Sequence, residues 1–228
     1  MSERSICIIG ASRGIGLGLA KEFAERGWQV VASERSESAQ LHAAAAEAGG
    51  LIEIVTIDVT DPDSFAGLKA KFGDGKLDAL VLNAGIYGPS NQMIDALERE
   101  ALVDILMTNA VGPAQAAATL MPCVKDGGTV GMMTSKMGSI DDSSGGLNYY
   151  RLSKVAQNML SRSLFEQHAK ERDIAVLSLH PGWVQTDMGG PNALIDVDTS
   201  VSGLADRIEG QDRAEHRFVA YDGQDVPW

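Results

Sequence analysis

The sequence first decides its fold at Ser5-Ile-Cys-Ile-Ile-Gly10-Ala-Ser-Arg-Gly14-Ile-Gly16, where an apolar run of strand length meets a glycine-rich turn. A helix-period segment follows directly. Glycines allow a tight turn and close backbone approach to a pyrophosphate, and the helix N-terminus offers free N–H groups and a positive dipole end to that anion. The stretch therefore predicts a dinucleotide site, although such a turn could also serve only to let helix and strand pack closely.

Six more apolar runs of strand length recur along the chain, and helix-period segments separate most of them. The runs are Gln29–Ser33, Ile52–Ile57, Leu77–Leu82, Thr129–Thr134, Ile174–Leu179 and Phe218–Tyr221. The segments are Gly16–Arg26, Ala39–Ala48, Ser64–Phe72, Ala96–Met121, Tyr150–Glu171 and Val201–Ile208. Because the runs are apolar on both faces, we expect a doubly wound α/β fold of Rossmann type, with a mostly parallel sheet of about seven strands. The last short run is expected to close one sheet edge.

The length of 228 residues suits one domain with its own core, and 44% hydrophobic and 22% charged residues are ordinary for a globular protein. No second alternating unit follows the first. Residues 1–228 are therefore expected to form a single dinucleotide-binding Rossmann domain. The substrate pocket must then be built from loops of the same sheet, around residues 183–200.

The formal net charge of −12 opposes a nucleic-acid partner, because phosphate backbones are bound by Lys and Arg clusters. The simplest interpretation of this acidity is a solvated surface that keeps the protein soluble. The N-terminus does not have the pattern of a signal peptide, and its apolar run is too short to span a bilayer. Cys7 and Cys123 have no metal-ligand spacing. We expect a cytoplasmic protein with no metal and no membrane association.

Further motifs follow the glycine turn in order, each at the carboxyl end of an expected strand or on an expected helix, where open α/β sheets bind ligands. They are Asp58 in Asp-Val-Thr, Asn83-Ala84-Gly85, Asn109 in Thr-Asn-Ala-Val-Gly-Pro, Ser135, Tyr150 with Lys154, and Pro181-Gly182-Trp-Val-Gln-Thr186. With the spacing G-x-x-x-G-x-G, this set resembles the short-chain dehydrogenase/reductase family over nearly the whole chain. The residues around Ser135 and Tyr150 and the closing Asp-Val-Pro-Trp228 are most similar to the compact C-signal type of carbonyl reductase within that family.

The resemblance implies an oxidoreductase that transfers a hydride between NAD(P)(H) and a small alcohol or carbonyl substrate. Such a reaction needs a side chain that exchanges the hydroxyl proton, and Tyr150 is the expected general acid/base. Lys154 lies one turn on, on the same helix face, and a cation within roughly 4–6 Å lowers the pKa of a phenol from about 10. Tyr149 has Ser153 at that offset and is expected to be a pocket or packing residue. A surface tyrosine beside a solvated lysine is the alternative.

Three more catalytic roles are implied by the resemblance. Lys154 holds the nicotinamide ribose hydroxyls, Ser135 hydrogen-bonds the substrate oxygen, and Asn109 positions water in a proton relay. Ser135 is preferred because it follows its strand directly and has a glycine three residues on. The competing hydroxyls are Ser139, Ser143 and Ser144. Asn109 could instead be a residue that bends its helix.

The resemblance also implies a set of cofactor-binding residues. Asp58 would accept a hydrogen bond from the adenine amine, unless it caps the following helix. Val184 and Thr186 would face the nicotinamide amide. His180 is expected to be a packed structural residue, since Tyr150 makes a second base unnecessary. The expected set is Gly10, Ser12, Arg13, Gly14, Ile15, Gly16, Glu34, Arg35, Asp58, Val59, Asn83, Ala84, Gly85, Tyr150, Lys154, Pro181, Val184 and Thr186.

The choice between NAD and NADP depends on conflicting residues. Glu34 ends the second strand, about 20 residues past the glycine turn, where an acid binds the adenosine ribose in NAD enzymes and would repel a 2′-phosphate. Arg35 and Arg13 are basic at places where NADP-using relatives are basic. The sequence slightly favours NAD.

Two other functions stay open. The fold could bind a nucleotide as a sensor or signalling protein with little turnover, or the chain could be an epimerase or dehydratase that returns the hydride to its substrate. The resemblance further implies a homodimer or homotetramer. Met137, Trp183, Met188 and residues 189–198 could line the substrate pocket, and the substrate itself does not follow from the sequence.

Overall fold

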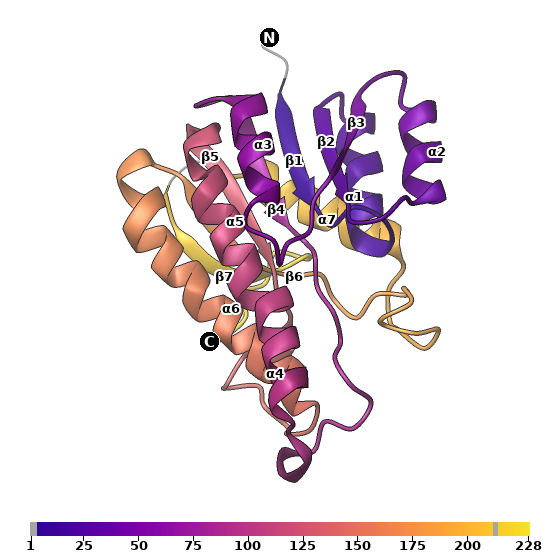
Figure 1. Ribbon diagram of the computed structural model, residues 1–228, viewed down its shortest axis with the longest axis vertical. Coiled ribbons are helices and arrows are strands. Elements are labelled where there is room, and N and C mark those ends of the chain that lie inside the picture. The colour runs from indigo at the N-terminus through magenta and orange to yellow at the C-terminus, as the bar shows by residue number, and fades with distance from the viewer. Residues whose placement is uncertain (1–3, 212–213) are drawn as a thin grey trace.

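Seven parallel strands form the central layer in the computed structural model, which describes residues 4–211 and 214–228 (Figure 1). Their order in the sheet is β3-β2-β1-β4-β5-β6-β7, and each neighbouring pair is parallel. The strands are β1 (Ser5–Ile9), β2 (Gln29–Glu34), β3 (Ile52–Thr56), β4 (Leu77–Leu82), β5 (Val124–Met133), β6 (Ala175–His180) and β7 (His216–Ala220). The expected doubly wound α/β fold is confirmed.

Helices cover both faces of this sheet (Figure 1). They are α1 (Gly14–Glu25), α2 (Ala39–Glu47), α3 (Ser64–Phe72), α4 (Arg99–Leu106), α5 (Gly112–Leu120), α6 (Asn148–Leu164) and α7 (Val197–Glu209). β1 shows how the two cores arise, because successive strand side chains point to opposite faces. Ile6 and Ile8 pack in one core with α1, α2 and α7, whereas Cys7 and Ile9 pack in the other with α3, α5 and α6.

The long helix expected over Ala96–Met121 is divided. α4 and α5 flank a π-helical turn, Met107–Val111, which contains Asn109. The chain passes very close to the loop after β3 at Gly112, where an added methyl group would lie 2.3 Å from the carbonyl oxygen of Val59. A π-turn carries one extra residue in a helix and often marks a functional site.

β5 begins at Val124, five residues before the expected start at Thr129. Val124 pairs with Leu77, and the register then shifts before Thr129 pairs with Ala79. The intervening Lys125-Asp-Gly-Gly128 is polar and rich in glycine, which strands disfavour, and so it does not have the pattern of a strand. β7 pairs with β6 and closes the sheet edge, as predicted.

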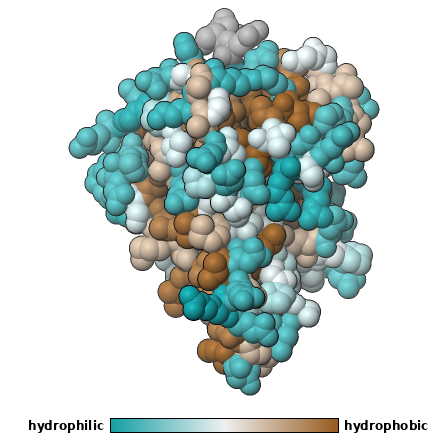
Figure 2. Space-filling model, viewed as in Figure 1, coloured by the Kyte–Doolittle hydropathy of each residue, from teal (hydrophilic) through white to brown (hydrophobic). Residues whose placement is uncertain are grey.

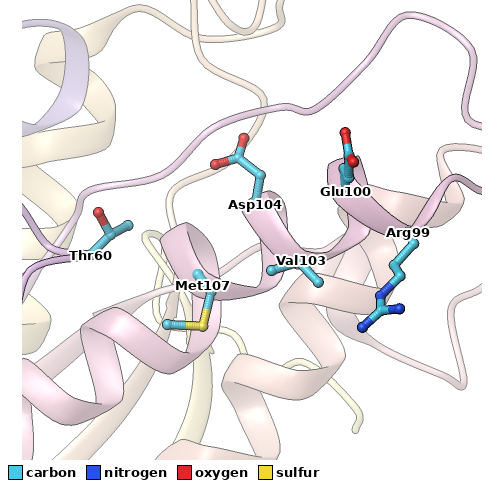
Figure 3. Close-up of a pocket in the computed structure, with 6 residues that line it drawn as sticks. All are labelled: Thr60, Arg99, Glu100, Val103, Asp104 and Met107. Carbon is cyan, nitrogen blue, oxygen red and sulfur yellow. The ribbon is translucent and has the colours of Figure 1, made fainter.

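Apolar side chains gather over the lower part of the molecule in the view of Figure 2, where α4 lies in Figure 1. Met93, Ile94 and Val103 are each more than half exposed there. Beside them, a shallow hollow of about 430 Å³ separates Thr60 from the exposed side of α4 (Figure 3). Val103 and Met107 form its apolar part.

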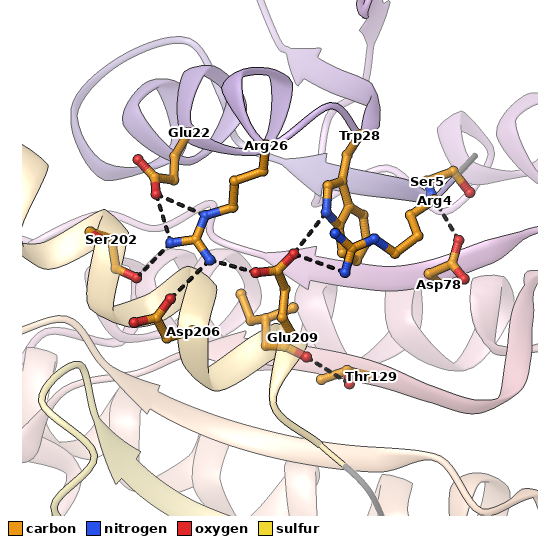
Figure 4. A network of polar contacts seen from close by, with 11 residues as sticks. Arg4, Ser5, Glu22, Arg26, Trp28, Asp78, Thr129, Ser202, Asp206 and Glu209 are labelled. Carbon is orange, nitrogen blue, oxygen red and sulfur yellow. Dashed lines mark hydrogen bonds and ion pairs between the residues drawn. The ribbon is translucent and has the colours of Figure 1, made fainter. Parts of the chain in front are cut away.

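A network of charged side chains fastens α7 to α1 (Figure 4). The Arg26 guanidinium, at the end of α1, pairs with Glu209 and lies 2.9 Å from an oxygen of Asp206. Glu209 also accepts a hydrogen bond of 2.8 Å from the Trp28 indole nitrogen. Because charge-assisted hydrogen bonds are stronger than neutral ones, this network holds α7 against the end of α1.

The strand order reverses between β1 and β4, and ligands of open α/β sheets bind in the crevice at such a point. The glycine turn follows β1 and Asn83-Ala84-Gly85 follows β4, so the two lie side by side at this edge. In the described ranges, no helix is long and apolar enough to cross a bilayer.

Candidate active site

The glycine turn packs tightly against the segment that follows β4. Gly10 has a φ of +91°, and an added methyl group would lie 2.6 Å from the backbone nitrogen of Ala84. Asn83 donates a 2.7 Å hydrogen bond from Nδ2 to the Gly10 carbonyl. A methyl group on Gly16 would lie 2.0 Å from that same carbonyl oxygen. The close packing that sequence reasoning offered as an alternative is therefore real, and it shapes the turn.

The first turn of α1 keeps its N–H groups free of side-chain caps. Arg13 is the N-cap residue and makes no capping hydrogen bond, and the turn carries no acidic residue. Ser33 supports the turn from below, since its hydroxyl accepts a 2.9 Å hydrogen bond from the Gly10 N–H and its carbonyl accepts one of 2.7 Å from Ala11. Sequence reasoning missed Ser33. These features suit a pyrophosphate at the helix N-terminus.

The Glu34 carboxylate is already bonded within the protein. The side chain is 8% exposed, one oxygen accepts a 2.8 Å hydrogen bond from the backbone of Ser38, and the other lies 2.9 Å from His42 Nε2. Arg35 is exposed, and Arg13 pairs with Asp187 at 3.0 Å on the surface. The lean to NAD assumed a Glu34 carboxylate free to bind both ribose hydroxyls, and the structure gives that carboxylate two other partners.

Asp58 lies in the loop after β3. One of its oxygens accepts hydrogen bonds from both the backbone and the hydroxyl of Thr60, at 2.9 and 2.7 Å, and these bonds lower the pKa of the carboxyl. Its carbonyl accepts a 2.8 Å hydrogen bond from the Ser64 hydroxyl at the start of α3. Asp58 thus holds the turn that leads into α3 through its bonds with Thr60 and Ser64. Val59, the next residue, is buried.

Tyr150 and Ser135 lie within hydrogen-bond distance of each other. Tyr150 is on the first turn of α6, and Ser135 follows β5. Burial raises the pKa of Tyr150 to about 12, and its hydrogen bond with Ser135 acts in the opposite direction. Tyr87 lies next to it, with ring centroids 5.3 Å apart.

Lys154 lies on the same face of α6, as the four-residue spacing predicted. Its Nζ is 5.7 Å from the centroid of the Tyr150 ring and donates 2.9 Å hydrogen bonds to the carbonyl of Met133 and to Oε1 of Gln157. Burial lowers the pKa of Lys154 to about 7, so the amine is only partly cationic near neutral pH. The expected lowering of the Tyr150 pKa is not found, because burial of the phenol raises the pKa more than the Ser135 hydrogen bond lowers it.

Asn109 is completely buried in the π-turn and braces the segment after β4. Its Oδ1 accepts a 2.7 Å hydrogen bond from the Ile86 backbone, and its Nδ2 donates to the Ile86 carbonyl at 2.8 Å and to the Ser153 hydroxyl at 3.0 Å. Gly85 lies between Asn109 and Lys154: a methyl group there would be 3.2 Å from Oδ1 and 3.8 Å from Nζ. The π-turn thus contains the residue, Asn109, that lies across Gly85 from Lys154.

The other candidate hydroxyls have different partners. Ser139, Ser143 and Ser144 accept hydrogen bonds from Asp142, Gly145 and Arg151 respectively.

Tyr149 is a packing residue, since it is 1% exposed and its hydroxyl contacts the backbone of Ala96 and Glu98. His180 accepts a 3.2 Å hydrogen bond from the Lys136 backbone, and its pKa is lowered, chiefly by burial, to about 4. The expectation that His180 is a packed structural residue agrees with this environment.

The loop after β6 runs past the glycine turn. Thr186 contacts the glycine turn, because a methyl group added at Gly14 would lie 3.3 Å from Cγ2 of Thr186. Val184 pairs with Ile195 in an isolated bridge, and the Pro181 carbonyl accepts a 2.7 Å hydrogen bond from Ser200 of α7. The loop is thus fixed at both ends and lies over the crevice edge.

Comparisons with known proteins agree with this geometry. Residues 4–193 match the model of the short chain dehydrogenase family. The chain is 39% identical over 159 residues to C-signal of Myxococcus xanthus. The matched region covers 68% of this chain and 94% of C-signal. It is 29% identical over 232 residues to 1-hydroxy-2-glutathionyl-2-methyl-3-butene dehydrogenase of Rhodococcus sp. strain AD45. That match covers 98% of this chain and 99% of the dehydrogenase.

Two solved structures share the fold over essentially the whole chain. A proposed short-chain dehydrogenase/reductase from Burkholderia multivorans with bound NADP has a TM-score of 0.94 and 36% identity, with 99% of this chain and 100% of that chain covered. A carbonyl reductase from Pseudomonas aeruginosa PAO1 in complex with NADP has a TM-score of 0.91 and 39% identity, with 100% of both chains covered.

Proposed function

This chain belongs to the short-chain dehydrogenase family and is an NAD(P)-dependent oxidoreductase, and from that premise we propose that it reduces a carbonyl compound with NADPH, with Tyr150 as the proton donor. The observation that carries the proposal is the partly buried Tyr150 phenol, hydrogen-bonded to Ser135 and one helical turn from Lys154. With Asn109, which lies across Gly85 from Lys154, these three residues make up the four that the motifs singled out as catalytic.

The residues at this edge of the sheet suit a dinucleotide. The uncapped first turn of α1 and the glycine backbone would hold the pyrophosphate, and Asp58 with Val59 would lie at the adenine end. Lys154 would hold the nicotinamide ribose, and Pro181, Val184 and Thr186 would lie beside the nicotinamide. The bound cofactor supplies the hydride.

Protonated Tyr150 is the form of the side chain that carbonyl reduction uses. A phenol with a pKa of about 12 keeps its proton near neutral pH, so the site holds the proton that a carbonyl oxygen takes up when its carbon receives a hydride. Ser135 would hold that oxygen beside the phenol. Lys154 and Asn109 would then return a proton to Tyr150 from solvent.

NADPH is preferred over NADH in this proposal. The partners of Glu34, Ser38 and His42, hold its carboxylate under the start of α2, while Arg13 and Arg35 present cations at the surface nearby. A 2′-phosphate binds to guanidinium groups in bidentate geometry. The two structurally similar proteins described with NADP support the same choice.

The surface around α4 is the proposed interface of a homodimer or homotetramer. α4 packs on α6, and Val103 of α4 and Met159 of α6 are 52% and 66% exposed. Large exposed apolar side chains on neighbouring helices favour burial against a second copy. The loop around residues 183–200, with half-exposed Trp183, is the proposed wall of the substrate pocket.

Consumption of NADPH with a panel of aldehydes and ketones tests this function directly. The proposal expects stoichiometric oxidation of NADPH with alcohol formation. A sensor would bind NADPH without consuming it, and an epimerase or dehydratase would convert its substrate with no net change in the cofactor. Either result across the panel would refute the proposed reaction.

A further inference from the structure

Gln157 lies one turn beyond Lys154 on α6, and both side chains are buried. Gln157 Oε1 accepts a 2.9 Å hydrogen bond from Lys154 Nζ. We propose that Gln157 is a positioning residue, whose amide oxygen fixes the place of the Lys154 ammonium and favours its charged form. Its importance for turnover rests on the proposed function, whereas its effect on Lys154 does not.

The Gln157 amide is a costly group to keep at this position. Its Nε2 is buried and has no hydrogen-bond partner among the described residues. A buried unpaired donor destabilises a protein, and a leucine or methionine would fill the space without one. The reversed amide would place two donors against each other at Nζ, so Lys154 also fixes which way the amide points. The amide therefore contributes through its oxygen, and that oxygen contacts Lys154.

The surroundings of Lys154 show why a neutral acceptor matters there. From α6 it faces the Tyr150 ring, and the Tyr87 ring in turn lies next to Tyr150. From β5 it receives the Met133 carbonyl, and from the π-turn the neutral amide of Asn109 lies across Gly85. Burial alone lowers the pKa of Lys154, and no described carboxylate opposes it.

Two hydrogen-bond acceptors therefore hold the ammonium, the backbone carbonyl of Met133 and the side chain of Gln157. A hydrogen bond to the charged form raises the pKa of a buried amine relative to the same site without that bond. Only the acceptor on Gln157 can be removed by substitution. Its loss should lower the pKa of Lys154 further and leave the side chain less fixed.

Titration of Lys154 in the cofactor-free protein tests this inference. The Nζ protonation is followed by NMR in protein carrying ¹³Cε-labelled lysine, and Lys154→Gln identifies the resonance. Gln157→Leu should lower the titration midpoint by about one pH unit, the amount that a charged hydrogen bond provides. Gln157→Glu should raise the midpoint by about one unit or more, because a carboxylate replaces the amide oxygen.

Ser161→Ala is the matched control. Ser161 is buried on the same helix, one turn on, and its hydroxyl donates to the Gln157 carbonyl without contacting Lys154. Its substitution should leave the midpoint unchanged. Gln157→Met, which keeps an unbranched side chain, replaces the leucine variant if leucine impairs folding.

The pH dependence of kcat for carbonyl reduction is the second measurement. If charged Lys154 is needed, Gln157→Leu should move the alkaline decline of kcat to lower pH by the same interval, and Gln157→Glu should move the decline to higher pH than in the wild type. A Lys154 midpoint unchanged in folded Gln157→Leu and Gln157→Met would overturn the inference. Shifted midpoints in a protein that turns over no carbonyl compound, wild type included, would instead contradict the proposed function.

Discussion

Replacement of Gly16 by alanine perturbs the glycine turn at its tightest point. The new methyl group would lie 2.0 Å from the Gly10 carbonyl oxygen and 2.6 Å from Asn83 Nδ2. Since non-bonded carbon atoms pack comfortably at about 3.5 Å, the start of α1 would have to move by about 1.5 Å. That movement would also break the hydrogen bond between Asn83 and Gly10.

The size of the effect follows from these contacts. Overpacking costs about 1–3 kcal/mol and the lost hydrogen bond about 1 kcal/mol, while alanine gains about 1 kcal/mol of helix propensity over glycine. We expect Gly16→Ala to destabilise the fold by about 1–3 kcal/mol. Gly67→Ala is the control, because Gly67 lies within α3 and an added methyl group there meets nothing within 4 Å. That variant should stabilise the fold by about 0.5–1 kcal/mol.

Urea unfolding and NADPH binding measure the two consequences. A displaced α1 cannot direct its first N–H groups at the pyrophosphate, so Gly16→Ala should bind NADPH about tenfold more weakly or worse, a loss of about 1.4 kcal/mol or more. Gly67→Ala should bind it normally. Wild-type stability and wild-type NADPH affinity in Gly16→Ala would refute the account of the turn.

Three further substitutions test separate parts of the structure. Tyr149→Phe should cost about 1–2 kcal/mol in urea unfolding, because it removes a hydroxyl bonded to the backbone near Ala96, yet kcat should stay near the wild-type value. Arg35→Ser should raise KM for NADPH more than KM for NADH, and an unchanged ratio would exclude Arg35 from binding the 2′-phosphate. Burial is the main cause that lowers the pKa of His180 to about 4, so the unfolded chain takes up its proton first as pH falls. The contribution of His180 to stability is therefore complete above about pH 6.5 and should fall by about 1–2 kcal/mol at pH 5. His180→Asn, compared by urea unfolding at pH 7 and pH 5, should lose less stability on acidification than the wild type.

The sequence located the strands well because parallel strands are buried on both faces and stand out as apolar runs. β1 and β4 have the predicted bounds, whereas the start of β5 was missed, since Lys125-Asp-Gly-Gly128 carries no apolar pattern and only its neighbours Val124 and Thr129 pair with β4. A bend at Asn109 was one of the two roles expected for that residue, whereas the π-turn that divides the helix was not predicted. Gly112 follows the turn directly, but its close packing against the Val59 backbone cannot be read from the sequence.

The candidate site could be assembled from ordered motifs, because a parallel sheet brings the residues after successive strands to one edge. The partners of Glu34 could not be predicted, since they depend on how α2 docks beside β2. The direction of the Tyr150 pKa could not be predicted either. Spacing places Lys154 on the correct face, but the pKa follows from the burial of both groups, which spacing does not report.

Tyr150 is proposed to donate the proton in an NADPH-dependent carbonyl reduction. The most direct test is the decrease in absorbance of the reduced nicotinamide, measured with a carbonyl substrate found in the panel, for the wild type and for Tyr150→Phe. Loss of the general acid should reduce kcat by about 10²–10⁴-fold while NADPH binds with nearly wild-type affinity. Full turnover by a folded Tyr150→Phe variant would contradict the claim.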